Sequence, residues 1–153
     1  MKPVILSGRV VRGYGRGSRE LGCPTANIDE ESVKWHLPKD FKYGIYYGWA
    51  KLITESSPTE GASQIYKMVA SVGMCPFYKN KSISVEVHLI HQFRDDFYGA
   101  TLKIMFLGFL REEKNFDSID ELIAAIREDV EKTKLALQAT ECQAMKDDPF
   151  FTK

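Results

Sequence analysis

A glycine-rich segment and a hydroxyl–amide pair near the N-terminus have residue types suited to binding a phosphate. Residues 13–18 read GYGRGS, and Thr25 and Asn27 lie in the sequence PTAN at residues 24–27. Glycines let backbone N–H groups approach an anion closely, and arginine adds charged donors. In an extended segment, the side chains of Thr25 and Asn27 point the same way. Together the two segments predict a site for a phosphate and a hard metal ion.

Taken alone, residues 13–18 fit an ordinary surface turn equally well, because glycine is common in turns. Other phosphate and nucleophile motifs are absent from the sequence. There is no GxxxxGK[S/T] loop, the GxGxxG pattern lacks its third glycine, and there is no GxSxG motif. His36, His88 and His91 have no acidic partners at the spacing of a metal site.

A glutamate in a predicted strand is the candidate for acid–base chemistry. Residues 83–93 read ISVEVHLIHQF, in which apolar and polar residues alternate as far as Leu89. This alternation places Glu86 on the face opposite the core. Taken alone, Glu86 fits a solvated strand glutamate better than a catalyst. His91 falls on the core-facing parity, where a structural role is the simpler interpretation.

Composition limits the class of protein. The chain has 153 residues, 44% of them hydrophobic, and equal numbers of basic and acidic residues, 21 of each. This predicts a single domain over residues 1–153 and argues against a nucleic-acid or membrane-surface partner. Cys23, Cys75 and Cys142 include no CxxC pair, so we expect free thiols and no structural zinc. We expect a soluble, cytoplasmic monomer.

The element pattern is a series of strands followed by one helix. A capping box at residues 118–121 precedes apolar residues at helical spacing, which predicts a helix of about five turns that packs on the strands. Many short strands in succession indicate an antiparallel barrel or sandwich. The predicted strands are residues 4–11, 44–52, 66–72, 83–93 and 101–110. The helix residues expected to face the core are Ile119, Leu122, Ile123, Ile126, Val130 and Leu137. The tail at residues 140–153 could dock or fray.

In their order and spacing, these motifs resemble the riboflavin kinases of the eukaryotic type. The resemblance covers about residues 8–137. Besides the two N-terminal segments and Glu86-Val87-His88, the matching segments are Gly44 to Ala50, Ser71-Val72-Gly73, Pro76 to Asn80, Asp96 to Gly99 and Lys114 to Ser118.

The resemblance implies a mainly β fold, a six-stranded antiparallel Greek-key barrel with a C-terminal α-helix. The barrel would occupy about residues 4–112 and the helix about residues 118–138. The implied activity is transfer of the γ-phosphate of ATP to the 5′-hydroxyl of riboflavin, which gives FMN and ADP.

The resemblance also implies roles for individual residues. Glu86 matches the catalytic carboxylate, which accepts the hydroxyl proton. Thr25 and Asn27 match contacts to the nucleotide phosphates and to Mg²⁺, and Zn²⁺ or Mn²⁺ stays open as the metal. The other nucleotide positions are Gly13, Arg19, Leu89, His91 and Tyr98, and the flavin positions are Arg111, Lys114 and Phe116.

Two departures and one rival function complete the sequence-based expectations. Glu112 replaces a proline common in the family, which predicts a looser flavin segment, and residues 54–63 form a longer loop of little chemical consequence. We expect no FAD synthesis. A non-catalytic barrel that binds a flavin or an oligonucleotide is the alternative, and zero net charge with Glu86, Thr25 and Asn27 in place argues against it.

Overall fold

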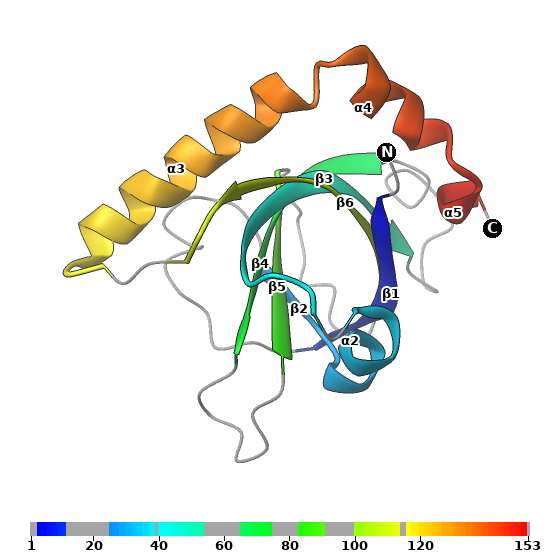
Figure 1. Cartoon of the computed structure of the whole chain (residues 1–153), viewed down its shortest axis with the longest axis horizontal. Coiled ribbons are helices and arrows are strands. Elements are labelled where there is room, and N and C mark those ends of the chain that lie inside the picture. Colours follow the sequence, from blue (N-terminus) through cyan, green and yellow to red (C-terminus); the bar gives the residue numbers. More distant parts are fainter. Residues whose placement is uncertain are drawn as a thin grey trace.

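Six strands in the described part of the chain form a closed antiparallel barrel (Figure 1). The computed structural model describes residues 3–11, 25–38, 40–53, 65–74, 83–90, 100–113 and 116–152. The strands are β1 (Val4–Val11), β2 (Thr25–Ile28), β3 (Gly44–Ile53), β4 (Ile65–Met74), β5 (Ile83–Leu89) and β6 (Thr101–Arg111). Their order around the barrel is β1-β2-β5-β4-β3-β6. Because β6 returns beside β3, the first strand of the β3–β4–β5 meander, this is the predicted Greek-key arrangement.

Alternate side chains of the strands fill the barrel. Met68 and Ala70 of β4 and Val85 and Val87 of β5 are at most 1% exposed and belong to one core cluster. Because successive side chains of a strand point to opposite faces, Glu86 lies on the outer surface of the barrel. The predicted alternation of residues 83–89 is therefore confirmed.

The predicted C-terminal helix is α3 (Ile119–Ala136), and its capping box is present. The Glu121 backbone N–H donates to Ser118 Oγ at 3.2 Å. In return, Glu121 Oε2 accepts from the Asp117 backbone N–H at 3.0 Å. The first bond satisfies an N–H group that has no partner within the first helical turn, which is why the helix begins at this point. The second differs from the standard capping box, because the Glu121 side chain reaches Asp117 and not Ser118.

The buried face of α3 differs from the predicted one. Ile119 was expected to face the core but is 55% exposed. The start of α3 projects past the barrel wall in Figure 1, so Ile119 has little to pack against. Ile126 and Leu137 are buried as predicted, and two polar residues that were not predicted to face the core, Asp129 and Thr133, are buried on the same helix.

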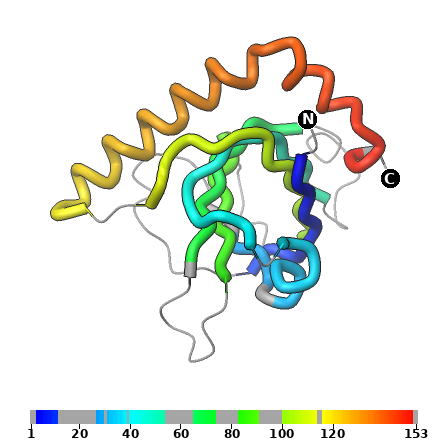
Figure 2. Tube along the Cα trace, viewed as in Figure 1, coloured from blue at the N-terminus to red at the C-terminus, as the bar shows by residue number. Residues whose placement is uncertain are grey.

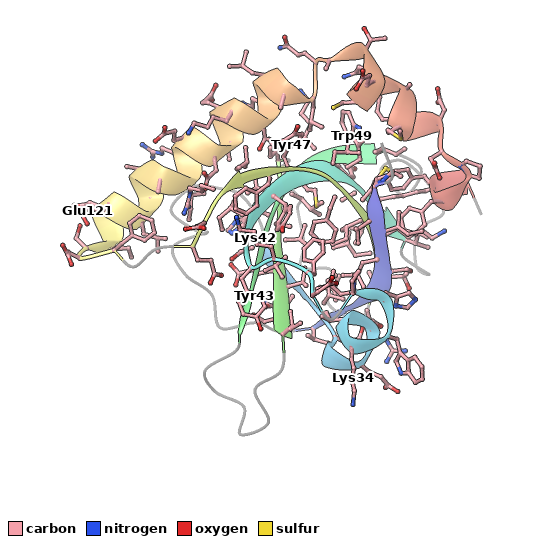
Figure 3. The ribbon with its side chains drawn as sticks, in the orientation of Figure 1. Lys34, Lys42, Tyr43, Tyr47, Trp49 and Glu121 are labelled. Carbon is pink, nitrogen blue, oxygen red and sulfur yellow. The ribbon has the colours of Figure 1, made fainter. Side chains whose placement is uncertain are left out.

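The tail docks on the barrel. It forms α4 (Thr140–Ala144), a 3₁₀ turn η1 (Met145–Asp147) and α5 (Pro149–Thr152), and Figure 2 shows it returning past the barrel towards the N-terminal end. The indole N–H of Trp49, labelled in Figure 3, donates to the Cys142 carbonyl at 2.7 Å. Lys51 Nζ donates to the Phe151 carbonyl at 2.6 Å, and Phe151 is only 1% exposed. These contacts decide between docking and fraying.

The described residues bear on two predictions, that the protein has no membrane-spanning segment and that its cysteines are free thiols. None of the helices in these ranges is long and apolar enough to cross a membrane. Cys142 is buried with a free thiol, and burial raises the pKa of that thiol. Cys23, Cys75 and the 54–63 loop lie outside the described residues.

Candidate active site

Asn27 and Glu86 are direct neighbours across two paired strands. The antiparallel register of β2 and β5 sets Asn27 opposite Glu86. Directly opposed residues have Cβ atoms about 5 Å apart and side chains on the same face of the sheet. The neighbouring pair is Thr25 with His88, of which Thr25 is described only by its main chain. The barrel thus places a carboxylate beside a carboxamide on its outer face.

His88 adds an imidazole to this outer face. Its Nε2 lies 3.3 Å from Glu86 Oε1, and the exposed fractions of the two side chains are 7% and 21%. The contact follows from their i, i+2 spacing on one strand, which puts both side chains on the same face. His88 Nδ1 is buried and has no hydrogen-bond partner in the described part of the protein. This nitrogen can donate or accept a hydrogen bond, depending on the tautomer.

A second carboxylate lies near Glu86 on the opposite side from Asn27. Ser71 of β4 pairs directly with Glu86, and its Oγ donates to Glu113 Oε1 at 3.3 Å. The Glu113 carboxylate fills the space that a Cβ at Gly73 would occupy. Gly73 therefore lets the chain that follows β6 approach β4 beside Glu86.

Asp29 holds the end of β2 and with it the position of Asn27. Asp29 is the N-cap of α2 (Glu30–His36), a short helix that the sequence analysis missed. Its carboxylate accepts from the Ser32 backbone N–H at 3.1 Å, the Ser32 hydroxyl at 2.9 Å and the Arg9 backbone N–H of β1 at 2.7 Å. Burial alone would raise the pKa of Asp29, but these hydrogen bonds outweigh it and lower the pKa below its ordinary value of 3.8.

We expect Asp29→Ala to lower the free energy of unfolding by about 1 kcal/mol near neutral pH, since a helix cap is lost. The lowered pKa means that the stabilisation is present above pH 3.8 and is lost as the pH falls below it. Urea unfolding of both proteins over this pH range measures the difference. Asp120→Asn, at an exposed position of α3, is the control. A difference that persists unchanged in acid would contradict the capping role.

The predicted flavin residue Arg111 lies at the end of β6 and is bound to the C-terminal helix. Its Nε donates to Asp129 Oδ1 at 2.9 Å and its Nη2 donates to Asp129 Oδ2 at 2.8 Å. The guanidinium carbon lies 5.8 Å from the centre of the Phe116 ring, within cation–π range. Arg111 and Phe116, both predicted from the sequence, are therefore brought together.

Glu112, at the position where the resemblance predicts a proline, forms an ion pair. Its Oε1 lies 3.6 Å from Lys42 Nζ, and both side chains are more than half exposed. Lys42, labelled in Figure 3, also lies over the Phe109 ring, 4.4 Å from its centre. An exposed pair of this kind contributes at most about 1 kcal/mol.

The remaining predicted residues fall into two groups. The Leu89 side chain is fully buried in the barrel core, so any contact of Leu89 with a nucleotide would come from its main chain. The others lie outside the described residues. They are Gly13, Arg19, His91, Tyr98 and Lys114.

Strand pairing connects the two ends of the candidate site. A single row of paired residues runs from Asn27 through Glu86, Ser71 and Ile45 to Arg111. Each step between strands is about 4.8 Å, so Glu86 and Arg111 lie about 14 Å apart around the barrel wall. One end offers a carboxylate beside a carboxamide, and the other a guanidinium beside an aromatic ring. An elongated substrate with an aromatic part and a reacting hydroxyl fits this division.

Sequence reasoning missed three side chains of this region, His88, Glu113 and Asp129. The i, i+2 spacing of Glu86 and His88 was a usable signal for the first. Glu113 and Asp129 make their contacts through the fold, and their positions in the sequence gave no signal. No group of three or more His, Cys, Asp or Glu side chains gathers for a metal within the described ranges.

Comparison with known proteins identifies the family of this chain. The model of the flavokinase family, described as riboflavin kinase, matches residues 1–137. Mouse riboflavin kinase is 48% identical over 149 residues, which cover 97% of this chain and 90% of the mouse protein. The human riboflavin kinase is 47% identical over the same shares of both chains. The crystal structure of riboflavin kinase from Trypanosoma brucei superposes with a TM-score of 0.74 at 32% sequence identity, over 100% of this chain and 91% of that one. The chain therefore belongs to the riboflavin kinase family.

Proposed function

We propose that the outer face of β2 and β5 is where this kinase transfers phosphate, with Glu86 as the general base. The chain is an ATP:riboflavin phosphotransferase that converts riboflavin to FMN. The observation that carries the residue assignment is the direct pairing of Glu86 with Asn27. The Cβ atoms of such a pair are about 5 Å apart. In this proposal Glu86 is the proton acceptor and Asn27 an oxygen ligand for the metal–nucleotide complex.

Glu86 would act on the 5′-hydroxyl of riboflavin. The hydroxyl oxygen attacks the γ-phosphorus in line, the new oxygen–phosphorus bond forms, and the bond to the bridging oxygen of ADP breaks. The hydroxyl proton passes to the Glu86 carboxylate. His88 Nε2 lies 3.3 Å from Glu86 Oε1 and would help to hold that carboxylate in place.

Asn27, together with Thr25, would hold the metal–nucleotide complex. Oxygen donors of this type suit Mg²⁺, which takes part of its coordination shell from substrate phosphates and water. When bound, the ion neutralises charge on the phosphates. The choice among Mg²⁺, Zn²⁺ and Mn²⁺ stays a prediction in favour of Mg²⁺.

Arg111 and Phe116 would bind the flavin at the other end of the row. The Phe116 ring supplies a surface on which an isoalloxazine can stack, and Arg111 supplies charge for a phosphate or a carbonyl oxygen. Lys114, Gly13, Arg19, His91 and Tyr98 keep their predicted roles as part of this proposal.

The activity is tested by incubating the purified chain with riboflavin, ATP and MgCl₂ and separating FMN by chromatography. We expect FMN to accumulate in proportion to enzyme, and to require both ATP and the metal. Reactions without ATP, and with excess EDTA, are the controls. FMN at the level of these controls would remove the kinase assignment.

Four expectations about the whole protein stay predictions. They are a single domain over residues 1–153, a monomer, a cytoplasmic location and the absence of a nucleic-acid partner. The odd number and wide spacing of the three cysteines support a cytoplasmic location, and the equal numbers of acidic and basic residues, 21 each, support the absence of a nucleic-acid partner.

A further inference from the structure

Arg111 and Asp129 form a bidentate ion pair. Both oxygens of one carboxylate accept from two nitrogens of one guanidinium, at 2.9 and 2.8 Å. Such fork-to-fork pairs fix the plane of the guanidinium as well as its position. The pair joins the last residue of β6 to the middle of α3.

Asp129 is unusually buried for an acidic residue. Its side chain is 4% exposed, and that of Arg111 is 20% exposed. Asp129 lies on the buried face of α3 with Ile126 and Thr133. Replacing a buried ion pair by apolar residues of similar volume is often neutral or stabilising. Stability alone is therefore a weak reason for an aspartate at this position.

The pair leaves Arg111 partly free. A guanidinium has five N–H groups, of which two bind Asp129 and one, on Nη1, donates to the Glu112 carbonyl at 3.2 Å. Counting only contacts with the described residues, one N–H therefore remains on each terminal nitrogen. Asp129 holds one edge of the group and leaves these two donors for a ligand.

The fixed guanidinium also lies over an aromatic ring. Its carbon is 5.8 Å from the centre of the Phe116 ring, on the chain that leads from β6 to α3. Phe116 and Arg111 come from opposite ends of this connection, and Asp129 contacts the arginine from the helix beyond it. A change at Asp129 would therefore act on Arg111, which contacts both Asp129 and the Phe116 ring.

We propose that Asp129 is a positioning residue for flavin binding. It acts through Arg111, holding the guanidinium plane and its two free N–H groups beside Phe116 before the flavin arrives. This preorganisation lowers the ordering cost of binding. The proposal rests on the proposed function, because it assumes that Arg111 and Phe116 face the flavin.

The first test is Asp129→Asn, measured by steady-state kinetics for both substrates. Asparagine keeps the shape but loses the charge and one of the two acceptor oxygens. We expect the KM for riboflavin to rise about tenfold, the factor that the loss of a charged hydrogen bond implies, and the KM for ATP to stay near its original value. Glu128→Gln, an exposed neighbour on the same helix, is the matched control. Equal increases in both KM values would indicate a purely structural role and overturn the proposal.

A double-mutant cycle tests whether Asp129 acts through Arg111. In an Arg111→Lys background the forked pairing is already lost, so Asp129→Asn should add little to the KM for riboflavin. Multiplicative effects of the two changes would overturn the proposal. The rate of FMN formation by the wild-type protein in the same assay tests the kinase function separately. The kinase function can therefore fail or hold independently of the positioning role of Asp129.

A second variant covers the case in which Asp129→Asn fails to fold, since breaking one partner of a buried pair is destabilising. Arg111→Met combined with Asp129→Leu removes both charges and restores an apolar contact. We expect this protein to melt near the wild-type temperature and to bind FMN, followed by its fluorescence, at least about tenfold more weakly. FMN binding at wild-type strength in the folded variant would overturn the proposal.

Discussion

Glu86→Gln is expected to lower kcat for FMN formation by about 10²- to 10⁴-fold, the usual contribution of a general base. Glutamine has the shape of glutamate but cannot accept the hydroxyl proton at neutral pH. Riboflavin binding should persist, because Arg111, the proposed flavin residue, lies at the other end of the row of paired residues, with the Phe116 ring beside it. Turnover by chromatography and flavin binding by fluorescence quenching measure the two quantities separately.

The control for this variant is Glu113→Gln. Glu113 is the other described carboxylate beside Glu86, linked to it through Ser71. If Glu86 is the base, Glu113→Gln keeps most of its turnover. Normal turnover in Glu86→Gln, or a larger loss in Glu113→Gln, would reassign the base.

Asn27→Ala is expected to weaken MgATP binding about a hundredfold and to leave riboflavin binding nearly unchanged, because it removes an oxygen ligand on the nucleotide side. The barrel should stay folded, since the Asn27 side chain lies on the outer face and the main-chain pairing with Glu86 is kept. Titration calorimetry with each substrate measures the effect. Ser84→Ala, on the outer face of β5, is the matched control. Equal weakening of both substrates would contradict the assignment of Asn27.

Much of the fold could be predicted because local patterns agree with it. Alternation over residues 83–89 gave the inner and outer faces of β5, and the capping box at Ser118 located the start of α3. The short helix α2 was missed because only Val33 and Leu37 at its end are buried apolar residues. Its real signal is the capping residue Asp29, three positions before Ser32.

The candidate site was less accessible to sequence reasoning. The neighbourhood of Asn27 and Glu86 depends on the register of β2 with β5, which no local pattern encodes. Helical periodicity treats an aspartate as exposed, so Asp129 could not be recognised as a buried partner of Arg111. The resemblance to a family supplied individual roles, and the barrel shows which of the described residues are neighbours.

A crystal structure with MgADP and FMN bound tests the central claim most directly. The account predicts that the phosphate-bearing oxygen of FMN lies within hydrogen-bonding distance of the Glu86 carboxylate, with Asn27 on the metal or the nucleotide phosphates. It also predicts the isoalloxazine ring against Phe116. An FMN phosphate bound away from the outer face of β2 and β5 would contradict the account.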